Sequence, residues 1–222
     1  MNYLPCIAIE PSGTVNASVI WLHGLGANGN DFASVATMIK LPDNVQVRYI
    51  FPHAPKIAVT INGGYRMPAW YDILDMSAER KIDLPGLLAS SDSIQDLVRR
   101  EIARGIDSSR IIIAGFSQGG AVAYQAALTF EQPLAGLLVM SSYFATHASI
   151  KRHTCNKQLP IHVYHGSVDP VVPEALGRQA KSYLQTMGYQ PEYTCYPAKH
   201  TVTAAQIEDI AAYLSKLFAL SS

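Results

Sequence analysis

Residues 110–130 combine a β-branched run, a glycine-flanked serine and an apolar helical pattern, and they restrict the fold more than any other stretch of the chain. The run RIIIA at 110–114 is typical of a strand buried on both faces, which belongs in a mostly parallel sheet covered by helices. The next five residues, GFSQG, place Ser117 between glycines that let strand and helix approach closely at a tight turn. A glycine-rich turn without any chemistry explains the same letters, so this motif alone leaves both interpretations open.

The alternation of apolar runs and helical patterns continues along the chain. Further strands are expected at 18–24, 45–55, 134–142, 160–169 and 192–200. Apolar stripes at helical spacing lie between them, as at Ile94, Leu97, Val98 and Ile102. The sequence therefore predicts the α/β class, with a mostly parallel central sheet and helices on both faces.

Length, charge and cysteine content narrow the class of protein. A chain of 222 residues with 49% hydrophobic residues and no repeat or linker is expected to form one domain, 1–222. Basic and acidic residues number 17 each, which argues against nucleic acid or an anionic membrane as partner. No apolar run approaches the roughly 18 residues that span a bilayer, so no stable membrane insertion is expected. Three scattered cysteines, and no basic residue before Lys40, indicate reduced thiols and a cytoplasmic location.

A serine at the carboxyl end of a strand needs a base and an acid, and both follow it when it stands in a G-x-S-x-G turn of this kind. Four acidic residues lie between Ser117 and His200, and only Asp169 stands at the carboxyl end of an expected strand. Among the seven histidines, only His200 both follows Asp169 and stands at a strand end. A single histidine is more often structural, but the order and position of the three residues favour a catalytic triad.

Acyl transfer also needs donors for an oxyanion, and the residues His23 to Gly26 (HGLG) supply a candidate directly after an apolar run. The backbone N–H groups of Leu25 and Gln118 could then point at the same spot, although an ordinary β-to-α turn explains HGLG as well. His162 and His165 do not suggest a metal site, because residues three apart on a strand face opposite sides. No metal and no cofactor are expected.

Six motifs follow one another along the chain: IWLHGLGANGNDF, FPHAP, RMPAWYDI, AGFSQGG, HGSVDPVVP and AKHTV. Together they resemble the phospholipase/carboxylesterase family of α/β-hydrolases, which includes the acyl-protein thioesterases. The resemblance runs nearly end to end and implies the α/β-hydrolase fold and a serine hydrolase. Position by position, it implies that Ser117 is the nucleophile, Asp169 the acid and His200 the base, with Leu25 and Gln118 as the backbone oxyanion donors.

The chain departs from the family pattern at a few positions. Members often carry an acidic residue at one of the positions where this chain has Ala27 and Asn28, and Gly or Met near the base, where it has PAK at 197–199. None of these departures removes a catalytic group. Lys199 precedes His200, but adjacent strand residues point apart, so little effect on the imidazole is expected.

Residues 56–90 show no sustained period and contain Gly, Pro and aromatic residues, which predicts a long substrate-binding loop. An apolar acyl groove could be lined by Trp70, Ile73, Leu74, Met76, Leu84, Leu87 and Leu88, with Val171 and Val172 opposite. Ordinary core packing explains these residues equally well. If exposed, Trp70 and Tyr71 would serve a substrate or a homodimer interface.

These observations predict a hydrolase that cleaves carboxylic esters or thioesters of acyl chains through an acyl-enzyme. The substrate would be a small acyl ester, a lysophospholipid or an acylated protein. A general short-chain carboxylesterase is the alternative. A non-catalytic α/β-hydrolase that serves as a binding module is a third reading, disfavoured because every catalytic position is filled.

Overall fold

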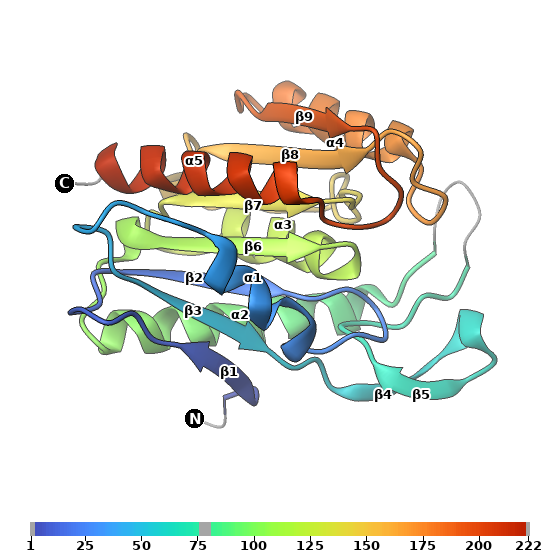
Figure 1. Cartoon of the computed structure of the whole chain (residues 1–222). Coiled ribbons are helices and arrows are strands. Elements are labelled where there is room, and N and C mark those ends of the chain that lie inside the picture. The colour runs from blue at the N-terminus through green and yellow to red at the C-terminus, as the bar shows by residue number, and fades with distance from the viewer. Residues whose placement is uncertain (1–2, 76–80, 221–222) are drawn as a thin grey trace.

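The computed structural model describes residues 3–75 and 81–220. Within these residues, a seven-stranded sheet has the order β1-β3-β2-β6-β7-β8-β9 (Figure 1). Its strands are β1 (Cys6–Ile9), β2 (Ala17–Leu22), β3 (Val47–Pro52), β6 (Ile111–Phe116), β7 (Gly136–Met140), β8 (Ile161–Gly166) and β9 (Glu192–Tyr196). Only β1 runs antiparallel to its neighbour, β3, so the predicted mostly parallel sheet is confirmed.

Helices cover both faces of this sheet, as predicted (Figure 1). The helices α1 (Asn30–Met38) and α5 (Ala204–Leu220) lie on one face. The other face carries α2 (Leu84–Ala103), α3 (Gln118–Thr129) and α4 (Glu174–Thr186). Side chains of β2 alternate between the two layers: Ile20 and Leu22 pack under α2 and α3, whereas Val19 and Trp21 pack under α1 and α5. None of these helices, over the described residues, combines the length and apolar character needed to cross a membrane.

The segment 56–90 is more regular than the predicted loop. It contains an antiparallel hairpin of β4 (Lys56–Val59) and β5 (Tyr65–Pro68), and it ends in the first turns of α2. A short 3₁₀ helix (Thr60–Asn62) closes the hairpin, and similar single turns lie at Ser108–Arg110 and Thr154–Asn156. The hairpin is exposed on most of both faces, so its sequence lacks the apolar alternation that marks a half-buried strand.

The edge strand β1 was also outside the prediction. It has four residues, and only one side of it pairs, so its side chains are mostly half-buried. Such a short, partly exposed run gives little period-2 signal. The carboxyl ends of the parallel strands, by contrast, all lie at one end of the sheet, and the hairpin of β4 and β5 lies near that end (Figure 1).

Candidate active site

Ser117 stands between the end of β6 and the start of α3, and its backbone has φ 53° and ψ −121°. A positive φ is strained for a residue with a side chain, at a cost of about 1–3 kcal/mol, and persists only where neighbours hold it. The Ser117 N–H donates to the Met140 carbonyl at 2.9 Å, and the Ser142 hydroxyl donates to the Ser117 carbonyl at 2.6 Å. Strand β7 and the residues after it therefore fix the strained turn.

Two glycines of the GFSQG motif make this turn sterically feasible. A Cβ at Gly115 would lie 2.4 Å from the Gly119 carbonyl oxygen. A Cβ at Gly119 would lie 2.5 Å from the carbonyl oxygen of His23, in the turn after β2. Only glycine lets β6, α3 and the HGLG turn approach each other this closely.

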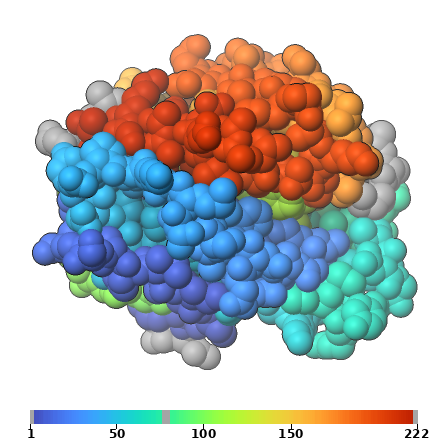
Figure 2. Space-filling model, in the orientation of Figure 1, coloured from blue at the N-terminus to red at the C-terminus, as the bar shows by residue number. Residues whose placement is uncertain are grey.

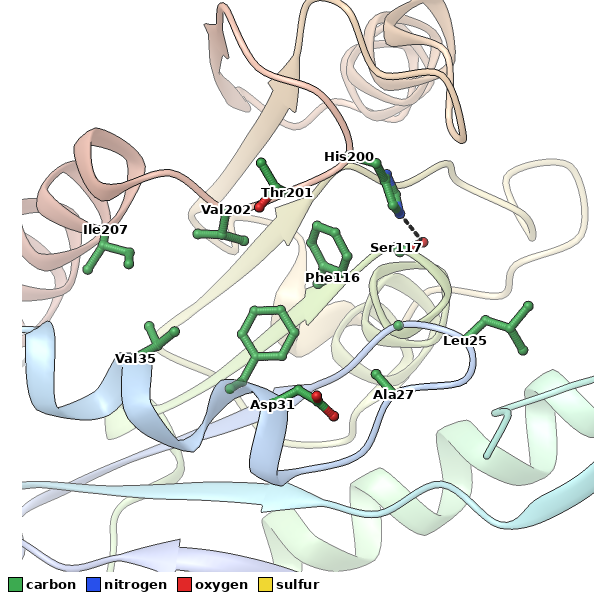
Figure 3. Close-up of a pocket in the computed structure, with 12 residues that line it drawn as sticks. Leu25, Ala27, Asp31, Val35, Phe116, Ser117, His200, Thr201, Val202 and Ile207 are labelled. Carbon is green, nitrogen blue, oxygen red and sulfur yellow. Dashed lines mark hydrogen bonds between the residues drawn. The ribbon is translucent and has the colours of Figure 1, made fainter. Parts of the chain in front are cut away.

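His200 joins Ser117 and Asp169 in a hydrogen-bonded row, and Figure 3 shows its bond to Ser117. Its Nε2 lies 2.9 Å from the Ser117 Oγ, and its Nδ1 lies 2.6 Å from the Asp169 Oδ2. Because the carboxylate accepts the Nδ1 proton, Nε2 is left to accept a proton from the hydroxyl. The three residues follow β6, β8 and β9, and only the His200 side chain is noticeably accessible, at 16%. His200 is therefore placed to accept the proton of the Ser117 hydroxyl.

The Asp169 carboxylate is held by its own loop. Its Oδ1 accepts hydrogen bonds from the N–H groups of Val171 at 2.8 Å and Val172 at 2.9 Å. The buried His165 Nε2 donates to the Val172 carbonyl at 2.8 Å, and this bond fixes the end of the loop to β8. Burial lowers the pKa of His165, which favours its neutral form beside the Asp169 carboxylate.

The HGLG turn lies beside Ser117 and is fixed by His23. The His23 Nδ1–H donates to the Gly24 carbonyl at 2.7 Å, and its Nε2 accepts the Ala54 N–H at 3.1 Å. Burial lowers the pKa of His23, which favours this neutral form. Over the described residues, the N–H groups of Leu25 and Gln118 have no hydrogen-bond acceptor, so both are available to a ligand.

The Gln118 side chain connects this turn to the segment 56–90. Its Oε1 accepts the Trp70 N–H at 2.9 Å, and its Nε2 donates to the Tyr71 carbonyl at 2.7 Å. The Trp70 indole N–H donates to the His23 carbonyl at 2.8 Å. The Trp70 carbonyl in turn accepts a hydrogen bond from the Ser90 hydroxyl, so residues near 70 are tied to α2 as well.

The residues expected to bind the acyl chain separate into two groups. Trp70 and Val172 are buried, at 1% and 2% exposed, which fits the core packing that the sequence left open for them. Tyr71 is buried as well, so the exposure that a role of Trp70 and Tyr71 at a dimer interface would need is not present. Ile73 and Leu87 are core residues, and Met76 lies outside the described residues. The exposed members of the set are Leu74, Leu84, Leu88 and Val171.

A pocket of about 360 Å³ opens beside Ser117 and His200 on the face that carries α1 and α5 (Figure 3). Its walls include Phe32 and Val35 of α1 and Val202 and Ile207 around the start of α5, with Phe116 between them. In Figure 2 the surface is hollowed between the α1 region, in blue, and the red segment before α5. Sequence reasoning missed this pocket because its walls come from segments about 170 residues apart.

The two histidines of β8 point to opposite faces of the sheet. His162 stacks on Tyr164 at 3.9 Å between ring centroids, and burial lowers its pKa to about 4. His165 instead lies against Gly177 of α4. Among residues 3–75 and 81–220, no cluster of three His, Cys, Asp or Glu side chains is arranged to hold a metal ion.

The parallel sheet, its two helical layers and the glycine-flanked serine at a strand-to-helix turn define an α/β-hydrolase. The chain belongs to the Phospholipase/Carboxylesterase family, whose model matches residues 5–218. It is 38% identical to acyl-protein thioesterase 1 of Neurospora crassa, over 96% of this chain and 91% of that protein. Identity to acyl-protein thioesterase 1 of Saccharomyces cerevisiae is 35%, over 97% of this chain and 98% of that protein.

Solved structures give the same assignment of fold. Arabidopsis thaliana SOBER1 superposes with a TM-score of 0.86 at 26% identity, covering 92% of this chain and all of that chain. Zea mays acyl-protein thioesterase 2 superposes with a TM-score of 0.82 at 23% identity, covering 97% of this chain and 99% of that chain. The second likeness, at this identity, concerns the fold alone.

Proposed function

We propose that this chain hydrolyses carboxylic esters or thioesters of acyl chains through an acyl-enzyme formed on Ser117. The observation that carries the proposal is the hydrogen-bonded row of Ser117, His200 and Asp169, which follow the carboxyl ends of β6, β9 and β8. Relatives that carry the name acyl-protein thioesterase support the same class of substrate.

In the first half-reaction, the Ser117 Oγ attacks the carbonyl carbon while His200 Nε2 takes the hydroxyl proton. The carbonyl electrons move to the oxygen, and the Leu25 and Gln118 N–H groups donate to the resulting oxyanion. When the oxyanion collapses, the bond from carbon to the leaving oxygen or sulfur breaks, and His200 transfers its proton to the leaving atom. The product is an alcohol or thiol, and the acyl group stays on Ser117.

In the second half-reaction, water replaces the leaving group and His200 takes one of its protons. Collapse of the second oxyanion releases the carboxylic acid and returns the proton to Ser117. Asp169 keeps the imidazole in the tautomer that faces Ser117, because its Oδ2 accepts the Nδ1 proton at 2.6 Å. The sequence of steps needs no cofactor.

The proposal extends to substrate and location. Exposed Leu74, Leu88 and Val171 would contact a medium or long acyl chain at the edge where the segment 56–90 lies. An acylated protein is favoured over a lysophospholipid by the names of the relatives. All three cysteines are free thiols, which supports the cytoplasm as the compartment.

The proposal is tested by replacing the nucleophile. Ser117→Ala should lower turnover of an acyl thioester by about a millionfold, because triad residues act as a unit. It should also abolish labelling by a fluorophosphonate probe. Ser149→Ala, at an exposed serine away from the site, serves as the matched control and should keep both activities. If Ser117→Ala retains substantial turnover, or the probe labels another serine, the proposed function is wrong.

A further inference from the structure

The pocket beside Ser117 and the segment 56–90 lie on opposite sides of the nucleophile. The pocket belongs to the layer of α1 and α5, whereas Trp70 and Tyr71 pack in the layer of α2 and α3. In Figure 3 Val35, Val202 and Ile207 lie on one side of Ser117, and the Leu25 side chain, which also borders the pocket, lies on the other. A substrate held across Ser117 therefore has two separate places for its two halves.

The chemistry of His200 indicates which half enters the pocket. The imidazole must protonate the atom that leaves, so the leaving group departs on the His200 side of the tetrahedral carbon. His200 and the next two residues, Thr201 and Val202, form one wall of the pocket. The pocket is thus next to the proton donor, where a leaving alcohol or thiol is released.

The walls combine aromatic faces with a single fixed charge. The Phe116 ring lies 4.7 Å from the His200 ring and 5.5 Å from the Phe32 ring, measured between centroids. Asp31 is the one Asp, Glu, Lys or Arg among the described residues that line the pocket. Aromatic faces and a carboxylate both favour a cation.

The Asp31 carboxylate is held at the rim. Its Oδ2 accepts the Asn28 N–H at 2.7 Å, and in Figure 3 the group lies beside Ala27. Over the described part of the chain, no Lys or Arg side chain lies within 4.0 Å of it. Its negative charge is therefore available to a bound group.

We propose that this pocket binds the leaving group, and that the leaving alcohol or thiol it selects carries a positive charge beyond a short apolar arm. The inference rests on the proposed function, since only a chain that cleaves acyl esters or thioesters has a leaving group. It adds a selectivity that is set by Asp31 and is independent of the acyl chain.

The test compares two thioesters with leaving groups of the same shape. Butyrylthiocholine releases a thiol with a quaternary ammonium, and S-(3,3-dimethylbutyl) thiobutyrate releases the neutral thiol with carbon in place of nitrogen. For the unaltered chain, kcat/KM should favour the charged thioester by about threefold to tenfold, the range of a partly exposed ion pair with cation–π contact. Salt at 1 M should reduce this ratio, because it screens exposed charges.

Substitution of Asp31 separates charge from shape. Asp31→Asn keeps an acceptor for the Asn28 N–H and should bring the ratio close to one, and Asp31→Lys should push it below one. Asp43→Asn, at an exposed carboxylate outside the pocket, should keep the full ratio. A ratio that survives in Asp31→Asn would overturn the assignment of Asp31.

The outcomes also separate this inference from the proposed function. A chain that labels with fluorophosphonate at Ser117 but cleaves the two thioesters equally, or cleaves neither, overturns the leaving-group pocket alone. A chain that neither labels nor cleaves any acyl ester overturns the proposed function, and the pocket assignment with it.

Discussion

Residues 111–120 and the segment 56–90 meet at the candidate active site, but they are held in opposite ways. In the first, nearly every side chain is buried. Its glycines lie so close to neighbouring atoms that an added Cβ would clash with them. In the second, a mostly exposed hairpin leads to a short buried stretch at Trp70 and Tyr71. The difference shows that steric exclusion fixes the backbone of one part of the site, whereas a few hydrogen bonds hold the other part in place.

The largest effect is expected at Asp169, the carboxylate that holds His200 against the tightly held Ser117 turn. Asp169→Asn should leave the chain folded and lower kcat by about four orders of magnitude, because the amide favours the wrong imidazole tautomer. Steady-state turnover, with a thermal melt as the check on folding, measures this. Wild-type-like turnover would mean that Asp169 does not orient His200 and would point instead to Glu131, Glu174 or Glu192.

A pair of glycine substitutions compares the two regions directly. Gly119→Ala places a Cβ 2.5 Å from the His23 carbonyl oxygen, and we expect it to lower the free energy of unfolding by about 2–4 kcal/mol. Gly63→Ala, in the hairpin, meets no atom within 4 Å and should lose only about 1 kcal/mol, from its φ of +64°. Urea unfolding gives both values. Equal losses of unfolding free energy at the two positions would contradict the view that steric contacts fix only the Ser117 turn.

Loss of the Gln118 side chain, which links the two regions, should lower stability by a smaller amount. Gln118→Ala leaves the Trp70 N–H and the Tyr71 carbonyl without their partner, which should lower stability by about 2 kcal/mol and speed hydrogen exchange at the Trp70 amide. Gln95→Ala is the control, because Gln95 is also buried but bonds to α3 away from the site. Unchanged exchange at Trp70 in Gln118→Ala would show that packing alone holds the segment.

The smallest effect concerns the exposed leucines. Each methylene of an acyl chain buried against them should add at most about 0.8 kcal/mol, or nearly fourfold in kcat/KM, until the groove is filled. Leu88→Asp should flatten this climb, whereas Met38→Asp, at an exposed residue of α1, should not. The profile is measured with nitrophenyl esters of increasing length. A wild-type profile that peaks at acetate and falls by butyrate would favour a short-chain carboxylesterase.

The same difference explains what could be predicted from the sequence. The strand and turn around Ser117 could be predicted because the steric limits on this turn act between residues adjacent in the sequence, so the GFSQG motif alone indicates it. Asp169 and His200 followed from the order of strand ends, and the structure places both within hydrogen-bond reach of one another. Local patterns and topology were sufficient for this part of the site.

The segment 56–90 could not be predicted in the same way. Trp70 is buried in the core, and its backbone N–H bonds to a side chain 48 positions later, a partner that no local sequence pattern indicates. The start of α2 near Leu84 gives no helical signal in the sequence, because its exposed leucines and Pro85 obscure the helical period. The pocket walls contributed by α1 and by the start of α5 are far apart in the sequence and come together only when the sheet forms.

The distance along the chain between nucleophile and base has a consequence for biosynthesis. Ser117 and His200 are 83 positions apart, and β9, which leads to His200, joins the sheet at its edge. A ribosome delivers residues in order, so a nascent chain contains the serine well before it contains the imidazole. A protein that acts as proposed therefore stays inert until His200 has been synthesised, and hydrolysis begins only after β9 has joined the sheet.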